Sequence, residues 1–279
     1  GSSARTQDLD RRSERMVGLG QVIISDTNLP DAVFQAQKYK IIVQITLIDK
    51  KEPTFRQISM GTGTVIGPGT VLTNRHVWNG AKPAMAKRDY ISVFSGLILA
   101  ERHMVEFPLR MVGIGEAGTF RDFLVLRAGP EIMSRAVDPN SPVTPNPYGI
   151  LLHDIEFVDD VGIGEKVYIV GYSPAYGNLK NANEQVVSVP YIDFINYTFH
   201  AEVAARIEEM PMNREGRVRR IYRYRDGAEP GFSGGMVIDE SGRLAGLTVS
   251  LSPALNFVYA LSARDIKDFL RANKISFRD

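Results

Sequence analysis

A serine stands between glycines in the run Gly231-Phe232-Ser233-Gly234-Gly235. A nucleophilic hydroxyl must be accessible to its substrate and must lie near backbone N–H groups that stabilise the developing oxyanion. Flanking glycines allow the sharp turn and the close substrate approach that such a site needs. The same run also fits a plain glycine-rich turn, so Ser233 is a candidate nucleophile whose partners must be sought elsewhere in the chain.

A general base and a carboxylate that could orient it occur upstream of this serine. His76 lies in Thr73-Asn74-Arg75-His76-Val77, directly after a short apolar run and a glycine turn, and a strand end would hold it rigidly. Asp122 opens the apolar run Asp122–Leu126, where burial of a carboxylate requires a hydrogen-bond partner such as a histidine Nδ1–H. Each residue also has a non-catalytic interpretation. His76 could be an ordinary surface histidine, and Asp122 could cap a strand or pair with Arg121. The order His, Asp, Ser nevertheless fits one catalytic template.

The elements that must position these residues are predicted to be strands. Runs of four to eight β-branched and apolar residues are separated by Gly and Pro, which is typical of an all-β protein. These runs cover residues 41–47, 62–66, 70–73, 166–170, 236–238, 244–249 and 257–260. A helix is predicted at the C-terminal end, where Ser262 and Asp265 form a capping box and apolar residues follow at helical spacing.

A proline-rich stretch divides the chain into two β halves. The predicted organisation is a polar, flexible N-terminal arm (1–32), an N-terminal β-barrel (33–137), a connector (138–149), a C-terminal β-barrel (150–261), and a C-terminal helix with its tail (262–279). His76 and Asp122 then belong to the first half, and Ser233 belongs to the second.

Six motifs, in the same order, resemble those of the HtrA/Deg branch of the trypsin-like serine proteases. The matching segments are Gly61–Ile66 with Leu72–Val77, Asp122–Leu126, Gly164–Tyr172, Pro230–Gly235, Gly242–Gly246 and Phe257–Ser262. The resemblance covers about residues 40 to 272. It implies two chymotrypsin-like six-stranded β-barrels with the active site in the cleft between them.

The resemblance also implies the role of each residue in a serine endopeptidase that forms an acyl-enzyme. His76 would be the general base, Asp122 the residue that orients it, and Ser233 the nucleophile, with the N–H groups of Gly231 and Ser233 as the oxyanion hole. The substrate would lie along a strand, and the expected substrate-binding residues are Gly227, Ala228, Thr248, Val249, Ser250 and Leu251. Leu251 would stand in the primary specificity pocket, which favours small aliphatic side chains unless Asp226 or Glu229 lines its base.

The chain departs from the family pattern in three ways. Phe232 replaces the asparagine that usually precedes the nucleophile, residues 178–225 are longer and more basic than expected, and the chain ends soon after the C-terminal helix, as a protease domain without the PDZ domain typical of many HtrA proteins. A second hypothesis stays open, because a triad in sequence does not guarantee an assembled oxyanion hole and HtrA-like domains can rest in inactive conformations. It is a latent or inactive trypsin-like domain that binds peptides along a sheet edge without turnover.

Other polar clusters are assigned no catalytic role. His103, His153 and His200 lack partner motifs, and no set of side chains has the spacing of metal ligands, so no metal and no cofactor is expected. Arginines that alternate with apolar residues between Arg217 and Arg225 fit a nucleic-acid surface. They fit better a solvated hairpin beside the cleft, which could bias it towards acidic substrates.

Composition restricts the partners of the protein. The 279 residues carry a net charge of +1 and no cysteine, which argues against a nucleic-acid or membrane partner and excludes disulfides and thiolate metal sites. No apolar run approaches the roughly 20 residues that span a bilayer. Polypeptide substrates are therefore expected, with oligomeric state open and a trimer compatible with the family.

The family resemblance implies an exported protein in quality control or regulated processing. The Gly1-Ser2-Ser3 start resembles a cloning remnant left after removal of a leader.

Overall fold

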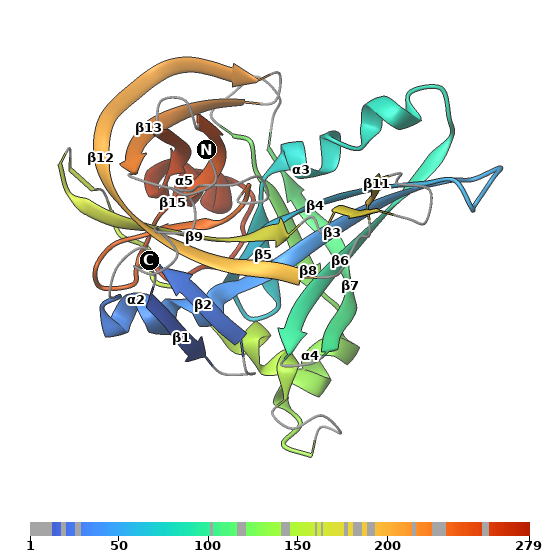
Figure 1. The fold of residues 1–279 in the computed structure, drawn as a ribbon, viewed down its shortest axis with the longest axis horizontal. Coiled ribbons are helices and arrows are strands. Elements are labelled where there is room, and N and C mark those ends of the chain that lie inside the picture. The colour runs from blue at the N-terminus through green and yellow to red at the C-terminus, as the bar shows by residue number, and fades with distance from the viewer. Residues whose placement is uncertain are drawn as a thin grey trace.

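The fold consists of two β-barrels that lie side by side (Figure 1). This computed structural model describes residues 13–17, 21–25, 29–100, 103–115, 121–140, 146–159, 161–162, 164–175, 178–180, 186–188, 193–213, 216–224, 233–252 and 257–279.

The first barrel is closed by six antiparallel strands in the order β3-β4-β5-β8-β7-β6. These strands are β3 (Lys40–Asp49), β4 (Arg56–Gly67), β5 (Thr70–Thr73), β6 (Tyr90–Ala100), β7 (His103–Ile114) and β8 (Leu124–Ala128). In β3, the alternate residues Ile41, Val43, Ile45 and Leu47 are buried in the barrel core. Ile42 points to the other face and packs in a cluster with Leu97 and with Tyr172 of the second barrel. The run from 41 to 47 is therefore continuously apolar because both of its faces are covered.

The second barrel also closes on itself. Six strands pair in the order β12-β13-β16-β15-β14-β9, and β9 pairs in turn with β12. These strands are β9 (Lys166–Ala175), β12 (Asp193–Asn213), β13 (Gly216–Tyr224), β14 (Met236–Ile238), β15 (Leu244–Ser252) and β16 (Phe257–Ser262). Both halves of the predicted architecture are thus formed by antiparallel strands, and β5 and β14 have the predicted bounds.

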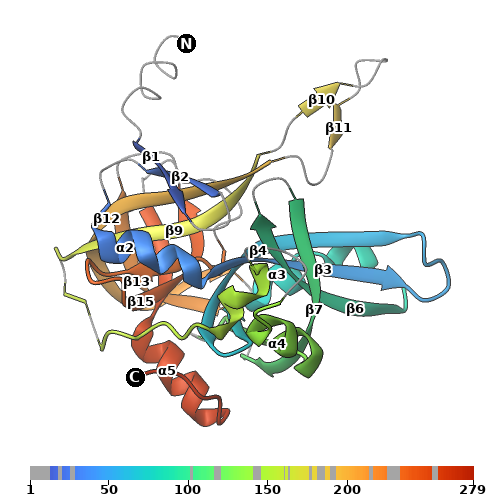
Figure 2. The same ribbon diagram turned by 90° about the horizontal axis from the view of Figure 1, so that it is seen from below.

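The N-terminal region differs from the expected irregular arm. β1 (Ser13–Val17) and β2 (Gln21–Ser25) form an antiparallel pair, and β2 adds in parallel to β12. The sequence did not predict these strands, which lie in a polar region and are held by pairing with each other and with β12. A further pair, β10 (Asn178–Lys180) and β11 (Val186–Ser188), stands away from both barrels in Figure 2.

Helices are more numerous than the sequence indicated. The predicted C-terminal helix is α5 (Ala263–Ala272), and the backbone N–H of Asp265 donates to the Ser262 Oγ as the capping box requires. The chain also forms α2 (Asp31–Gln35), α3 (Arg75–Asn79), α4 (Pro130–Val137) and the 3-10 helices η2 (Ala36–Tyr39), η3 (Lys82–Met85) and η4 (Pro147–Leu152). No helix among the described residues is long and apolar enough to cross a membrane.

A shared core joins the two barrels. Phe123 and Val125 of the first half pack in one buried cluster with Tyr168 and Leu247 of the second half and Phe269 of α5. The expected fold class is confirmed: a mostly β protein with a closed six-stranded barrel, a second sheet and a C-terminal helix. The division into domains stays a prediction in its exact boundaries.

Candidate active site

His76 lies in the first turn of α3, which begins two residues after β5 ends. The backbone N–H of His76 donates to the Asp122 Oδ1 over 3.0 Å, so the main chain of the histidine is held as well as its ring. The imidazole Nδ1 lies 2.6 Å from the Asp122 Oδ2. The His76 side chain is 23% exposed, which leaves one side of the ring accessible.

Asp122 is fully buried, with a side-chain exposure of 0%. It lies just before β8, so the carboxylate enters the junction between the barrels at the end of a strand. Its backbone carbonyl accepts hydrogen bonds from the Asn74 Nδ2 at 3.1 Å and from the Arg75 N–H at 3.3 Å. A buried carboxylate is stable only when its oxygens accept hydrogen bonds, and both oxygens of Asp122 face His76.

Ser233 lies in the turn that precedes β14 of the second barrel. Its Oγ is 2.7 Å from the His76 Nε2 and 3.1 Å from the carbonyl oxygen of Val249. A neutral imidazole that donates from Nδ1 to Asp122 has Nε2 as an acceptor for the Ser233 hydroxyl proton, for which the Val249 carbonyl is a second acceptor. The structure therefore brings together the three residues that the sequence proposed as a triad.

Gly234 gives the turn its shape. Its φ of +84° lies in the left-handed region that favours glycine. A Cβ at this position would overlap the Thr62 carbonyl oxygen and the Thr73 Oγ1. The glycine after Ser233 is therefore required both by the backbone conformation and by the close approach of the first barrel.

β15 passes directly behind the serine. The N–H of Thr248 donates to the Gly235 carbonyl, and its own carbonyl accepts from the Gly234 N–H, both at 2.9 Å. Both backbone groups of Thr248 are thus engaged within the fold, which differs from the expectation that they would bond a substrate. Val249 is the extra residue at a bulge between Thr248 and Ser250, and its carbonyl faces Ser233.

Several residues assigned from the sequence lie outside the described residues or are described as backbone alone. Gly227, Ala228 and Gly231 lie outside the described residues, as do Phe232, Asp226 and Glu229. Ser250 and Leu251 are placed only as backbone in β15, where they pair with Tyr259 and Val258. The oxyanion hole and the walls of the specificity pocket therefore stay predictions.

The residues that support the triad were missed by the sequence interpretation. Asn74 is fully buried and reaches Asp122, and Thr62 and Thr73 are fully buried between the barrels. The sequence does hold a hint of them, because each is a polar residue within or next to an apolar strand run. A polar side chain that is buried in this way forms hydrogen bonds.

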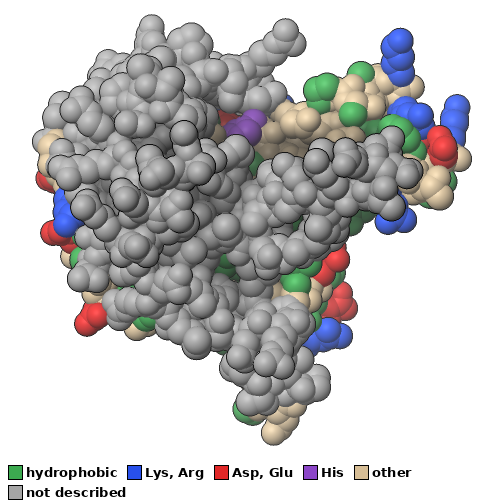
Figure 3. Space-filling model, viewed as in Figure 1, with side chains coloured by type: hydrophobic (Ala, Val, Ile, Leu, Met, Phe, Trp, Pro, Cys, Tyr) green, Lys and Arg blue, Asp and Glu red, His purple; other side chains and the backbone are tan. Residues whose placement is uncertain are grey.

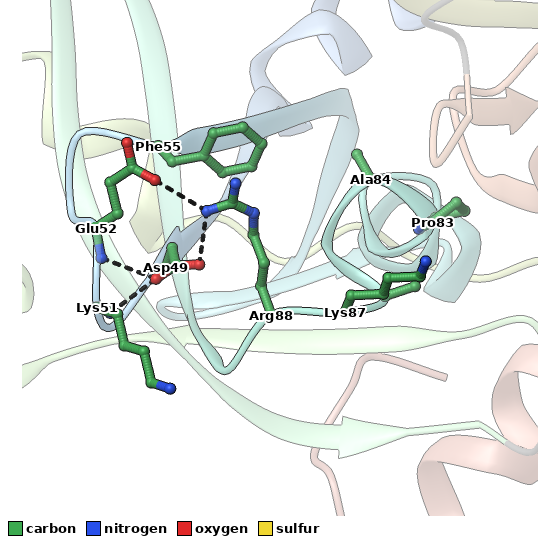
Figure 4. Close-up of a pocket in the computed structure, with 9 residues that line it drawn as sticks. Asp49, Lys51, Glu52, Phe55, Pro83, Ala84, Lys87 and Arg88 are labelled. Atoms are coloured by element: carbon green, nitrogen blue, oxygen red, sulfur yellow. Dashed lines mark hydrogen bonds and ion pairs between the residues drawn. The ribbon is translucent and has the colours of Figure 1, made fainter.

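A pocket of about 680 Å³ lies on the first barrel (Figure 4). Charged side chains gather at this end of the barrel, where β3 turns into β4 (Figure 3). In the pocket, Arg88 donates to the Asp49 Oδ2 and the Glu52 Oε2, and its guanidinium lies 3.7 Å from the centroid of the Phe55 ring. These groups satisfy one another, and no triad residue lines the pocket, so it is not part of the candidate site.

His153 follows η4 and packs edge-on against Tyr39, with ring centroids 5.8 Å apart. Burial lowers the pKa of His153, and the nearby Lys38 lowers it further. The side chains of His103 and His200 lie outside the described residues. Among the side chains that the structure describes, no group of three or more His, Asp or Glu could hold a metal ion.

Solved structures share this fold. The Rv3671c protease from M. tuberculosis in its active form matches with a TM-score of 0.52 at 19% identity, covering 91% of each chain. Deg5 matches with a TM-score of 0.52 at 17% identity, covering 85% of this chain and 89% of the other. The HtrA-type protease AlgW, solved with a decapeptide, matches with a TM-score of 0.52 at 15% identity, covering 89% and 68%.

A comparison with curated proteins gave no significant match. The sequence pattern of the family described as trypsin-like peptidase domain matches residues 61–247, which is more than half of the chain and contains His76, Asp122 and Ser233. The chain therefore belongs to the trypsin-like peptidase family, whose HtrA-type members share its fold, and it is a serine endopeptidase by class.

Proposed function

We propose that the protein hydrolyses peptide bonds with Ser233 as the nucleophile, His76 as the general base and Asp122 as the residue that orients the base. The observation that carries this proposal is the continuous chain from Asp122 Oδ2 to His76 Nδ1 at 2.6 Å and from His76 Nε2 to Ser233 Oγ at 2.7 Å. Both lengths are within hydrogen-bonding reach without any movement of the side chains.

In the first half-reaction, the Ser233 Oγ attacks the carbonyl carbon of the substrate while its proton passes to the His76 Nε2. The carboxylate of Asp122 holds the Nδ1–H tautomer and stabilises the imidazolium that forms. The imidazolium then gives its proton to the leaving amine, the C–N bond breaks, and an ester of Ser233 remains. In the second half-reaction, His76 takes a proton from water as the water attacks the ester. The imidazolium then returns this proton to the Ser233 Oγ as the C–O bond breaks and the acid leaves.

The N–H groups of Gly231 and Ser233 are proposed to bind the oxyanion of each tetrahedral intermediate. The glycines on both sides of Ser233 support this assignment, because they allow the sharp turn that brings backbone N–H groups close to a substrate. Preorganised donors of this kind contribute about 10²- to 10³-fold to turnover.

The substrate is proposed to lie along β15. Val249 supports this assignment, because its carbonyl lies 3.1 Å from the Ser233 Oγ and so faces the position of the scissile bond. Leu251, Gly227 and Ala228 are proposed to line a pocket for a small aliphatic side chain such as Val, Ala, Ile or Leu. Cleavage of a peptide library, read by mass spectrometry, tests this specificity, and a dominant preference for Lys or Arg at the cleavage site contradicts it.

A serine-directed phosphonate probe, together with a casein cleavage assay, tests the proposed function. Covalent labelling at Ser233 and cleavage are both expected. A folded protein that neither reacts with the probe nor cleaves casein would favour the alternative, a latent domain that binds peptides. A role in protein quality control, a trimeric state and an exported location stay predictions from the family resemblance.

A further inference from the structure

The fully buried side chain of Thr62 lies in β4 of the first barrel, where this strand meets the second barrel. Three of its polar groups bond to three different elements. Its N–H donates to the Ser233 carbonyl at 2.8 Å, and its Oγ1 accepts from the Tyr172 N–H of β9 at 3.0 Å. Its carbonyl accepts from the Thr73 Oγ1 at 2.8 Å. One residue thus contacts the nucleophile, the second barrel and the strand that leads to His76.

Thr64, two residues further along β4, forms a hydrogen bond to the next carbonyl of the turn that contains Ser233, called here the nucleophile turn. Its Oγ1 donates to the Gly234 carbonyl at 3.2 Å, and the Thr64 side chain is fully buried. The approach of β4 to the turn is close, because a Cβ at Gly61 would lie 2.9 Å from the Ser233 carbonyl oxygen. Two consecutive carbonyls of the turn are therefore bonded to the opposite barrel.

This arrangement matters because the nucleophile and its base belong to different barrels. Catalysis requires the reacting atoms to be placed within a fraction of an ångström, and a small displacement of one barrel relative to the other would separate Ser233 from His76. The bond from Thr73 to Thr62 is on the His76 side, because Asn74 follows Thr73 and bonds to Asp122. Ser233 in the second barrel and the segment that carries His76 in the first barrel are thus both hydrogen-bonded to β4.

We propose that Thr62 and Thr64, the threonine clamp, are positioning residues that fix the Ser233 turn against His76 across the barrel junction. The inference rests on the proposed function, because it concerns the same nucleophile. The threonine clamp does not touch substrate. Its loss should therefore lower kcat and the rate of phosphonate labelling while KM changes little.

Thr64→Val removes the side-chain bond to the Gly234 carbonyl and retains the shape of the side chain, whereas Thr64→Ser retains the hydroxyl. Thr64→Val is expected to lower kcat by about tenfold to a hundredfold, and Thr64→Ser is expected to keep most of the wild-type kcat. Thr70→Val is the matched control, because Thr70 is a buried threonine of β5 whose Oγ1 bonds to the nearby Pro68 carbonyl. It should lower the melting temperature without lowering kcat.

Wild-type kcat in folded Thr64→Val overturns the inference, and so does a kcat of Thr64→Ser as low as that of Thr64→Val. If Thr64→Val does not fold, Thr62→Val decides, because it removes the acceptor for the Tyr172 N–H and with it the side-chain bond between β4 and the second barrel, and an unchanged kcat then overturns the inference. Failure of the proposed function is distinct: the wild-type protein itself would show neither labelling nor cleavage.

Discussion

The ring of Phe269 in α5 packs on the ring of Phe123, with centroids 4.9 Å apart, and Phe123 follows directly after Asp122. Both aromatic side chains are buried in the cluster that joins the barrels. The C-terminal helix is therefore in contact with the residue beside the buried carboxylate of the proposed triad, although the helix lies about 150 residues further along the chain.

Phe269→Ala is expected to lower both stability and turnover. The cavity should cost about 3–5 kcal/mol in the free energy of unfolding, and relaxation of Phe123 into it should displace Asp122. Urea unfolding and a peptidase assay measure the two effects. Phe277→Ala is the control, because Phe277 packs on Phe157, with ring centroids 5.2 Å apart, and should affect stability alone. Equal loss of turnover in both variants would contradict the link from α5 to Asp122.

Gly234→Ala is expected to lower turnover by about a hundredfold or more. The positive φ and the contacts of the added Cβ with Thr62 and Thr73 force the nucleophile turn to move. Gly149→Ala is the control, because an added Cβ there meets no atom within 4 Å. A peptidase assay at equal concentrations of folded protein measures the effect, and similar turnover in the two variants would show that the turn tolerates a side chain.

Asn74→Ala should weaken the support of Asp122. It removes the hydrogen bond from the Asn74 Nδ2 to the Asp122 carbonyl, and loss of such a buried bond costs about 1–3 kcal/mol. Turnover should fall together with the free energy of unfolding. Asn146→Ala is the control: it removes a more exposed side-chain bond to the Arg135 carbonyl and the acceptor for the Tyr148 N–H, far from Asp122 in sequence and outside the candidate site, and should spare turnover. Full activity of Asn74→Ala would exclude a role for this bond in placing Asp122.

Lys40 gives a prediction on pH. Its Nζ donates to the Gln37 Oε1 at 2.9 Å and lies 4.5 Å from the centroid of the Tyr172 ring, and burial lowers the pKa of Lys40 well below its usual range. Between the lowered pKa and about 10.4, the unfolded chain binds more protons at this residue, so the free energy of unfolding rises with pH in that window. Lys40→Met removes this dependence.

The free energy of unfolding of the wild type should therefore rise relative to that of Lys40→Met as pH rises from 7 towards 10, and urea unfolding of both proteins at several pH values measures it. A difference between the two proteins that stays constant with pH would contradict the pKa shift.

The sequence predicted strands such as β3, because β-branched, apolar runs such as Ile41–Leu47 favour a strand that is covered on both faces. It also proposed His76, Asp122 and Ser233 together; these residues lie within hydrogen-bonding reach in the fold, and their catalytic roles stay predictions. The runs of β6, β7 and β12 were not among the predicted strands; in β12, His200–Met210 is rich in Ala and Glu and carries little strand preference of its own. Pairing with β9 and β13 imposes that strand, and such partners are known only in the folded chain.

The contacts of Thr62 and Asn74 were not predictable for the same reason. A buried threonine or asparagine can bond to many groups, and its choice depends on elements that are distant in sequence. Thr62 is more than 100 residues away from both Tyr172 and Ser233.

The central claim is that Ser233, His76 and Asp122 act as one unit, and labelling with a phosphonate probe tests it most directly. The wild-type protein should be labelled at Ser233 by mass spectrometry, Ser233→Ala should not be labelled, and His76→Ala and Asp122→Asn should react slower by orders of magnitude, because the three residues depend on one another. Labelling of His76→Ala at the wild-type rate, or labelling at a residue other than Ser233, would contradict the account.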